Sequence, residues 1–322
     1  MKQSILIVIG GALASLLAIP QMAAFFARSA RSESDAMRDT DEIRQTFKLT
    51  PGTRVEISSI RGPVEIETSN GDTAEILITR TANNPADLQK DKITFDNKPG
   101  RLIIRGETAR DGNKSPNVNH HATLKLPRNI NLAINSISGS VQLGDLNGQL
   151  EVSSISGSVT MDKVAQQAGF KSISGDVKIG QVAGPLDISG VSGSVTLDQL
   201  THGAHIQSVS GDVKITQATD SFEISSVSGN VSAVIAKLGT GGVHISSVSR
   251  QVELRFRNEV DAQFTANSIS RDVSINLPNV TIQDKSAAST RAVIGKGGPS
   301  ISINSVSGGV RLMLDTQTRS QE

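Results

Sequence analysis

A six-residue phrase built on Ser-Ile-Ser-Gly returns at a fixed interval along the middle of this 322-residue chain. Its successive copies read SISGSV, SISGSV, SISGDV, GVSGSV, SVSGDV and SVSGNV. Their glycines lie 18 residues apart, at Gly139, Gly157, Gly175, Gly193, Gly211 and Gly229. A fixed period of this kind in strand-forming residues is typical of a β-solenoid, in which each repeat stacks on the one before it.

The apolar residues keep the same spacing in each repeat. In one repeat they are Val152, Ile155, Val159, Met161, Val164 and Ala168. Steps of two favour a strand, whereas the steps of three and four predict corners, and no helical period is sustained. One repeat cannot bury its own apolar side, so stacking must close the core and pair each strand with its copies.

The glycine of the phrase and the polar residues that follow it also recur at fixed positions in the repeat. We expect the glycine of the phrase to take φ > 0 at a corner, a conformation that costs glycine nothing sterically. Asp176, Lys178, Asp212 and Lys214 mark every second repeat, and the repeats between them carry serine and threonine at these positions. This alternation keeps like charges from lying directly opposite one another, which would destabilise a sheet.

The N-terminal residues 1–27 have a charged start, a short apolar run and then small residues, the layout of a secretory signal peptide. We expect export, with cleavage near Ala24 or Ser29. The alternative is an uncleaved signal anchor, because the run from Ile5 to Phe26 is just long enough to span a bilayer. The chain has no cysteine, which excludes a lipid-modified cysteine anchor and disulfides.

The rest of the chain divides by its patterns. Residues 28–46 are polar and predict a linker, and residues 47–130 predict an irregular N-terminal β region that caps the solenoid, because open strand edges recruit other chains. Residues 131–316 predict the β-helix repeats, with one degenerate coil before the last phrase, and residues 317–322 predict a tail. His120 and His121 lie in the cap without a recognisable partner spacing. The predicted fold is therefore an all-β, single-stranded β-helix with 18-residue coils.

Composition argues against several functions. The chain has 32 basic and 31 acidic residues without a basic patch, so nucleic acid is a poor partner. It has no tryptophan or tyrosine, the residues whose flat apolar faces usually line sugar sites. No catalytic constellation and no cofactor motif is evident, and we predict neither.

One column of ionisable residues stands out. Asp187, His205, Glu223 and His244 occupy the same position in four successive coils. If the coils stack in register, carboxylates and imidazoles alternate along one line. Such a column could bind a transition metal, or sense pH because imidazoles gain a proton near pH 6.5. The simpler interpretation is an exposed ladder of opposite charges that stabilises the stack weakly.

A second pair of acids permits an enzymatic alternative. Asp162 and Asp198 lie two coils apart, or about 9.6 Å at two strand spacings. That separation is near the upper limit for the two carboxylates of an inverting glycosidase. A polysaccharide-degrading enzyme is therefore a further hypothesis, without a third acid or an aromatic subsite to support it.

The repeated phrase Ser-Ile/Val-Ser-Gly-Ser/Asp-Val behind a signal sequence resembles the bacterial putative-adhesin family of β-strand-repeat proteins, a domain of unknown function. The resemblance covers about Val55 to Leu314. It implies a right-handed, single-stranded β-helix of the cell envelope and carries no catalytic residues over to this chain. The handedness comes from the resemblance, since the repeat length also suits left-handed solenoids.

The expected function follows from these points. We expect an exported, non-enzymatic protein of the periplasm or cell envelope that offers one face to a protein, an envelope surface or another copy of itself. The alternative is a periplasmic scaffold or envelope-stress module held at the inner membrane by an uncleaved N-terminus. The membrane is a partner only through the N-terminal segment, and only if that segment is not cleaved.

Overall fold

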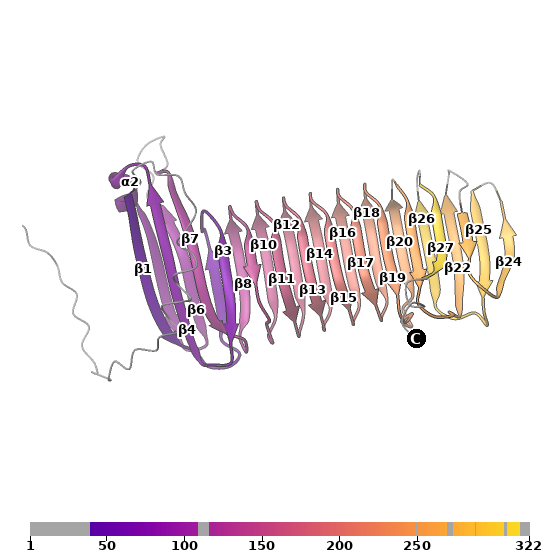
Figure 1. Ribbon diagram of the computed structural model, residues 1–322, viewed down its shortest axis with the longest axis horizontal. Coiled ribbons are helices and arrows are strands. Elements are labelled where there is room, and N and C mark those ends of the chain that lie inside the picture. The colour runs from indigo at the N-terminus through magenta and orange to yellow at the C-terminus, as the bar shows by residue number, and fades with distance from the viewer. Residues whose placement is uncertain are drawn as a thin grey trace, which may run out of the picture. The chain divides into compact units, whose positions relative to one another are not determined.

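The computed structural model of the chain describes residues 39–108, 116–248, 250–268, 273–286, 288–305 and 308–315. Within these ranges two sheets of 13 and 14 strands form one continuous stack, and a short helix, α2 (Pro85–Lys90), lies beside its first strands (Figure 1). The all-β prediction is confirmed. The described ranges contain no helix of the length and apolarity that crossing a bilayer requires. The predicted signal segment, residues 1–27, lies outside the described residues.

Each sheet takes alternate strands of the chain over most of its length. The first sheet contains β1 (Asp39–Lys48), β3 (Val64–Ser69), β4 (Thr73–Ala82), β7 (Val118–Pro127), β9 (Val141–Leu143), β11 (Val159–Val164), β13 (Val177–Val182), β15 (Val195–Leu200), β17 (Val213–Ala218), β19 (Val231–Ile235), β21 (Val252–Phe256), β23 (Val273–Asn276) and β27 (Val310–Leu314). The second contains β2 (Arg54–Ser58), β5 (Asp91–Lys98), β6 (Arg101–Thr108), β8 (Asn131–Ile137), β10 (Leu150–Ile155), β12 (Ala168–Ile173), β14 (Leu186–Val191), β16 (Ala204–Val209), β18 (Phe222–Val227), β20 (Val243–Val248), β22 (Ala262–Ser268), β24 (Val280–Lys285), β25 (Ser289–Ile294) and β26 (Ser300–Ser305).

Matching residues of successive repeats lie opposite one another in parallel strands. In the second sheet, Val152 of β10 lies between Ile134 of β8 and Phe170 of β12. In the first sheet, β11 pairs in the same way with β9 and β13. The repeat phrase therefore produces vertical rows of like residues, as expected for a β-solenoid.

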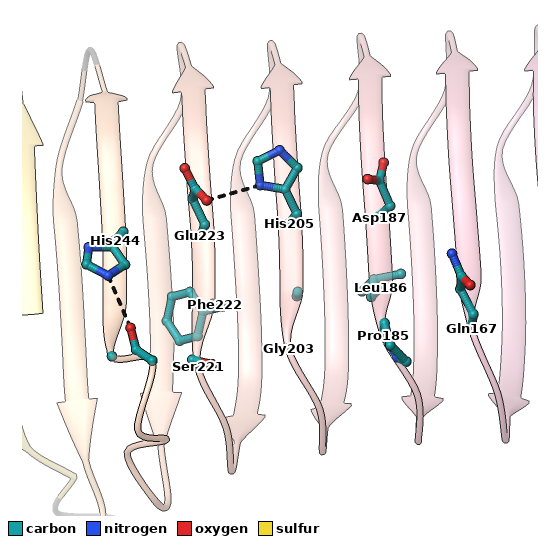
Figure 2. Close-up of a pocket in the computed structure, with 13 residues that line it drawn as sticks. Gln167, Pro185, Leu186, Asp187, Gly203, His205, Ser221, Phe222, Glu223 and His244 are labelled. Carbon is teal, nitrogen blue, oxygen red and sulfur yellow. Dashed lines mark hydrogen bonds and ion pairs between the residues drawn. The ribbon is translucent and has the colours of Figure 1, made fainter. Parts of the chain in front are cut away.

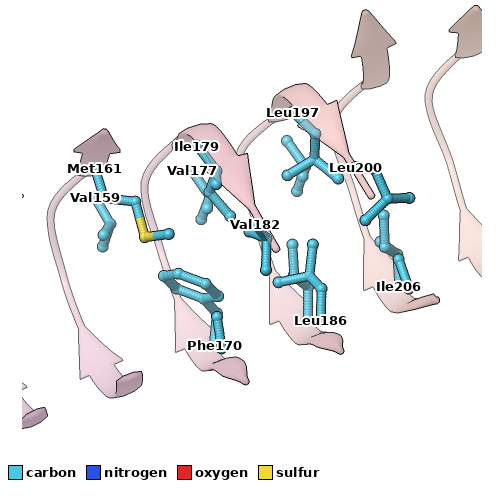
Figure 3. Packing of buried hydrophobic residues seen from close by; sticks show 14 of the residues in the cluster. Val159, Met161, Phe170, Val177, Ile179, Val182, Leu186, Leu197, Leu200 and Ile206 are labelled. Atoms are coloured by element: carbon cyan, nitrogen blue, oxygen red, sulfur yellow. The ribbon is translucent and has the colours of Figure 1, made fainter. Parts of the chain in front are cut away.

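The apolar residues of the repeats fill the space between the two sheets (Figure 3). The six predicted core positions of one repeat, Val152, Ile155, Val159, Met161, Val164 and Ala168, are all at most 2% exposed. Full burial of a side chain such as Phe170 contributes about 1.5–3 kcal/mol. Because one repeat supplies only half of each contact, this stabilisation exists only in the stack.

The corners differ in one respect from the prediction. The turns lie at residues 156–158 and 165–167, inside the four-residue steps of the apolar pattern. The three-residue steps fall inside β10 and β11 instead. In β11 both Asp162 and Lys163 are exposed, between buried Met161 and buried Val164. The register with β13 does not shift there, so neighbouring coils share the same local bend, which turns the next apolar side chain back into the core.

The predicted φ > 0 at the glycines of the phrase is wrong. None of the six has φ in the left-handed region. A Cβ on Gly157 would lie 2.5 Å from the carbonyl carbon of Gly139, and one on Gly175 would lie 2.6 Å from that of Gly157. Successive corners touch backbone against backbone, so the position requires a residue without a side chain.

The aspartates of alternate repeats hold the neighbouring corner. The Asp176 carboxylate accepts a hydrogen bond of 2.8 Å from the backbone N–H of Ser194. The Asp212 carboxylate accepts one of 2.7 Å from the N–H of Asn230. Each aspartate thus binds an amide one coil further on, a local side-chain to backbone bond of the kind short polar residues make at turns.

Residues 39–46 form a strand, although the sequence predicts a linker there. They belong to β1, which runs antiparallel to β4 with Ile43 opposite Ile78. Ile43 and Phe47 are half-buried on one face, and the Phe47 ring lies 5.8 Å from that of Phe95. β1 has five charged residues, of which all but Asp41 are exposed, and they mask the strand alternation in the sequence.

The two ends of the stack depart from chain order. The last copy of the phrase does not follow the preceding coil, because β26 lies between β20 and β22, and β27 between β21 and β23. The residues expected to form a degenerate coil form β24 and β25 instead, with β25 antiparallel to both β24 and β22. At the other end β2 and β3 are inserted in the same manner. Antiparallel strands close the N-terminal end of both sheets, β1 and β4 in the first and β5 in the second. At the C-terminal end β24 and β25 close the second sheet, whereas the first sheet ends on β23, which is parallel to β27.

Replacing Gly175 with alanine should lower the free energy of unfolding by about 1–3 kcal/mol, because the added Cβ overlaps the backbone of the coil before it. Gly169→Ala is the matched control, since nothing lies within 4 Å of a Cβ at Gly169. It should change stability by less than about 0.5 kcal/mol. Urea denaturation followed by circular dichroism measures both, and equal losses in the two variants would contradict the backbone-contact explanation.

Candidate functional site

The four residues of the predicted ionisable column lie on neighbouring strands. Asp187 of β14 is the Cα partner of His205 of β16, His205 is the partner of Glu223 of β18, and Glu223 is the partner of His244 of β20. Figure 2 shows their side chains in one row on the outer face of the second sheet. The parallel ladder sets their spacing at about 4.8 Å per strand.

A groove of about 490 Å³ runs beside this row. Its residues come from three adjacent rows: the ionisable column, the apolar row that precedes it in each strand, and the turn before that. They are Gln167, Pro185, Leu186, Asp187, Gly203, Ala204, His205, Ser221, Phe222, Glu223, Gly241, Gly242 and His244. Small residues account for the hollow, because Gly203 and Ala204 lie between the larger side chains of the coils on either side (Figure 2).

The members of the column differ in how they are held. His205 Nδ1 lies 3.5 Å from a Glu223 carboxylate oxygen, and His244 Nε2 donates to the Gly241 carbonyl at 3.1 Å. The amide nitrogen of Gln207 contacts His205 Nε2, which leaves the ring proton on Nδ1 facing Glu223. Among the described residues Asp187 has no hydrogen-bonding or ion-pairing partner. Its carboxylate is thus available to a ligand.

The arrangement of the column's side chains determines whether they could coordinate a metal ion. In the part of the chain that the structure describes, no three histidine, aspartate or glutamate side chains are grouped as a metal site would require. His205 and Glu223 supply two donors, whereas structural and catalytic metal sites take three or four protein ligands. The arrangement is better suited to hydrogen bonding and charge recognition than to coordination.

The acids of the enzymatic alternative lie on the opposite sheet. Asp162 is on β11 and Asp198 is on β15, with Gly180 of β13 between them. Asp198 accepts a long hydrogen bond of 3.5 Å from Thr216. Asp162 lines a second groove, of about 460 Å³, with Glu65, Glu67, Asp145 and Arg128 among its other residues, and Asp198 is not part of it. The two carboxylates therefore do not share one cleft.

The structure also shows a buried polar cluster in the N-terminal region that sequence reasoning missed. His120 Nε2 lies 2.7 Å from an Asp91 carboxylate oxygen, and neither side chain is exposed to solvent. Thr108 donates to the other oxygen at 3.1 Å, and Arg80 Nη1 lies 3.9 Å from the same carboxylate. Arg80 also pairs with Asp41 at the edge of β1. The cluster joins five strands, β1, β4, β5, β6 and β7.

The hydrogen bonds define the protonation of His120. The backbone N–H of Arg61 donates to His120 Nδ1 at 3.1 Å, so this nitrogen carries no proton. The ring proton is on Nε2 and points at Asp91, and the imidazole is neutral. Arg80 supplies the positive charge that balances the buried Asp91 carboxylate.

A signal for this cluster was present in the strand period. Val118, His120 and Ala122 alternate with more exposed residues, and all three are buried. A polar residue in a buried row requires a partner. The sequence does not indicate which residue is the partner of His120. Asp91 lies on β5, and β6 separates that strand from β7 in the chain. The cluster is structural, since none of its buried atoms can reach a ligand.

A family model described as Toastrack DUF4097 matches residues 53–313 of this chain. This match agrees with the resemblance that the repeat phrase indicated. No curated protein matches the chain.

Several crystal structures are similar to the chain. A putative adhesin from Bacteroides fragilis is 11% identical with a TM-score of 0.36, and the match covers 85% of this chain and 97% of that one. A putative lipid binding protein from Parabacteroides distasonis is 14% identical with a TM-score of 0.36, over 84% and 96% of the two chains. A putative cell adhesion protein from Clostridium sporogenes is 10% identical with a TM-score of 0.22, over 85% and 100%.

Replacing Asp91 with alanine should destabilise the chain by about 1–3 kcal/mol, because it leaves the buried Nε2–H of His120 without an acceptor while Arg80 keeps its ion pair with Asp41. Asp96→Ala on the same strand is the control. Asp96 pairs with Lys98 at 2.8 Å in an exposed position, and its loss should cost less than about 1 kcal/mol. Chemical denaturation of both variants measures the difference. Similar small losses would show that the cluster does not hold the N-terminal region together.

Proposed function

This chain belongs to the Toastrack DUF4097 family, and we propose that it is an exported, non-enzymatic β-helix protein of the cell envelope that binds a partner through an exposed groove. The proposed protein is a right-handed β-helix with 18-residue coils, and its signal peptide is removed on export. The groove beside Asp187 and Glu223 carries the proposal, because it combines apolar surface with accessible ionisable groups.

The composition of this groove supports recognition over catalysis. Ser221 is its sole hydroxyl residue among those described, and it contacts Asp220 instead of a histidine. A nucleophilic serine requires a base within hydrogen-bonding reach. Exposed acids and imidazoles on a rigid sheet can instead bind charged groups of a partner with little loss of conformational freedom.

The stack itself supports a role as a rigid display surface. Parallel strands pair along its length, and the core between the sheets is continuous. In a solenoid each coil contacts its neighbours, so an outward row keeps a constant spacing over many coils. A partner that binds along such a row makes the same contact with each successive coil.

The N-terminal segment favours one other candidate. The apolar run from Ile5 to Phe26 is long enough to remain in the membrane if no peptidase removes it. The protein would then be a scaffold or envelope-stress module tethered at the inner membrane. The groove and the stack would serve the same binding role from a fixed position.

Fractionation of a bacterium with two membranes should place the full chain in the periplasm or the envelope. Deletion of residues 1–27 should leave the protein in the cytoplasm, because the export signal is lost. N-terminal sequencing of the exported protein should find a new terminus between residues 24 and 29. An intact N-terminus in the membrane fraction would support the tethered alternative, and full-length protein in the cytoplasm would contradict both.

A further inference from the structure

We propose that the groove beside Asp187 and Glu223 binds an extended basic segment in the polyproline II conformation, with a lysine or arginine at every third residue. This inference rests on the proposed function and names the chemistry of the partner. The segment would run along the stack, across the strands.

The charge of the groove selects a cation. Asp187 and Glu223 line it, and none of its described lining residues is lysine or arginine. A smaller hollow of about 290 Å³ continues it past Asp187, and there Arg54 and Lys171 oppose Glu151 and Asp187. Arg54 pairs with Glu151 at 3.3 Å. The unbalanced negative charge is therefore at the end that holds Asp187 and Glu223.

The spacing of these two acids selects the conformation of the segment. They lie two strands apart, which is about 9.6 Å. A polyproline II helix rises about 3.1 Å per residue with three residues per turn, so residues i and i+3 lie on one face about 9.3 Å apart. A β-strand repeats on one face every two residues, or about 6.6–6.8 Å, and cannot place consecutive side chains of one face on both acids.

Pro185 gives the groove an exposed apolar surface that suits proline. Leu186 and Phe222 lie beneath the row of acids and imidazoles (Figure 2), but they are core residues only 3% and 2% exposed. Apolar grooves bind polyproline segments well because the peptide is already extended and loses little entropy. Gly203 keeps the middle of the groove open. A Cβ there would meet nothing closer than the Ser221 carbonyl at 3.9 Å.

The test uses two peptides of identical composition, blocked at both ends: four repeats of Lys-Pro-Pro, and a control with four lysines followed by eight prolines. Calorimetry at low salt keeps surface charges from being screened. At pH 7.5 the periodic peptide should bind the mature exported protein at least tenfold more tightly than the clustered one.

Variants assign the binding to the groove. Asp187→Asn with Glu223→Gln should weaken the periodic peptide at least tenfold. Asp162→Asn with Asp198→Asn removes the same charge at the same two-coil spacing from the opposite sheet and should have no effect. Gly203→Gln fills the groove without changing charge, and it places there the residue that the equivalent positions Gln149 and Gln167 already carry. It should abolish binding while leaving the urea midpoint unchanged.

Equal affinities for the two peptides would overturn the inference, because they would show attraction to net charge without register. Equal losses in the two double variants would do the same. Neither result bears on export, which fractionation decides separately. Binding of the periodic peptide by a protein found in the cytoplasm would overturn the proposed function and leave the groove assignment standing.

Discussion

Contact between the backbones of successive coils is the constraint on which this structure depends. Parallel strands must approach to about 4.8 Å to share hydrogen bonds, and at the corners this brings one glycine directly onto the next. Any side chain at Gly157 or Gly175 would separate the coils. Their close approach keeps Val152 over Ile134 and Phe170, and so keeps the apolar rows continuous. The row of Asp187, His205, Glu223 and His244 on the outer face takes its spacing from the same ladder.

The buried cluster at Asp91 and His120 and the column at Asp187 differ in how their charged groups are satisfied. Asp91 and His120 are fully buried, and their hydrogen-bonding groups are met by Thr108, Arg80 and the backbone of Arg61. Such a set specifies how five strands fit together, because a buried charge without a partner is costly. Asp187 and its column remain accessible to solvent, where an unpaired carboxylate costs little.

Antiparallel strands form three of the four sheet edges at the ends of the stack, and the fourth is the parallel strand β23. Insertion of β26 and β27 between earlier coils places a regular repeat inside the stack and leaves the antiparallel hairpin of β24 and β25 outside it. The N-terminal end is arranged in the same way: β2 and β3 lie next to the regular coils, and β1, β4 and β5 lie outside them. An antiparallel strand with a charged outer face is a poor template for another parallel coil.

The sequence by itself determined the all-β class, the in-register rows and the candidate column at Asp187, His205, Glu223 and His244. Residues that recur at one period must face one another once coils stack, so these rows follow from local pattern alone. Tertiary structure decided the strand at residues 39–48, the insertion of the last coil, the Asp91–His120 contact and the hollow at Gly203. The first three arise from pairing between segments that share no period. The repeat marks Gly203 as the position equivalent to Gln149 and Gln167, but the hollow there also depends on how the side chains of neighbouring coils pack.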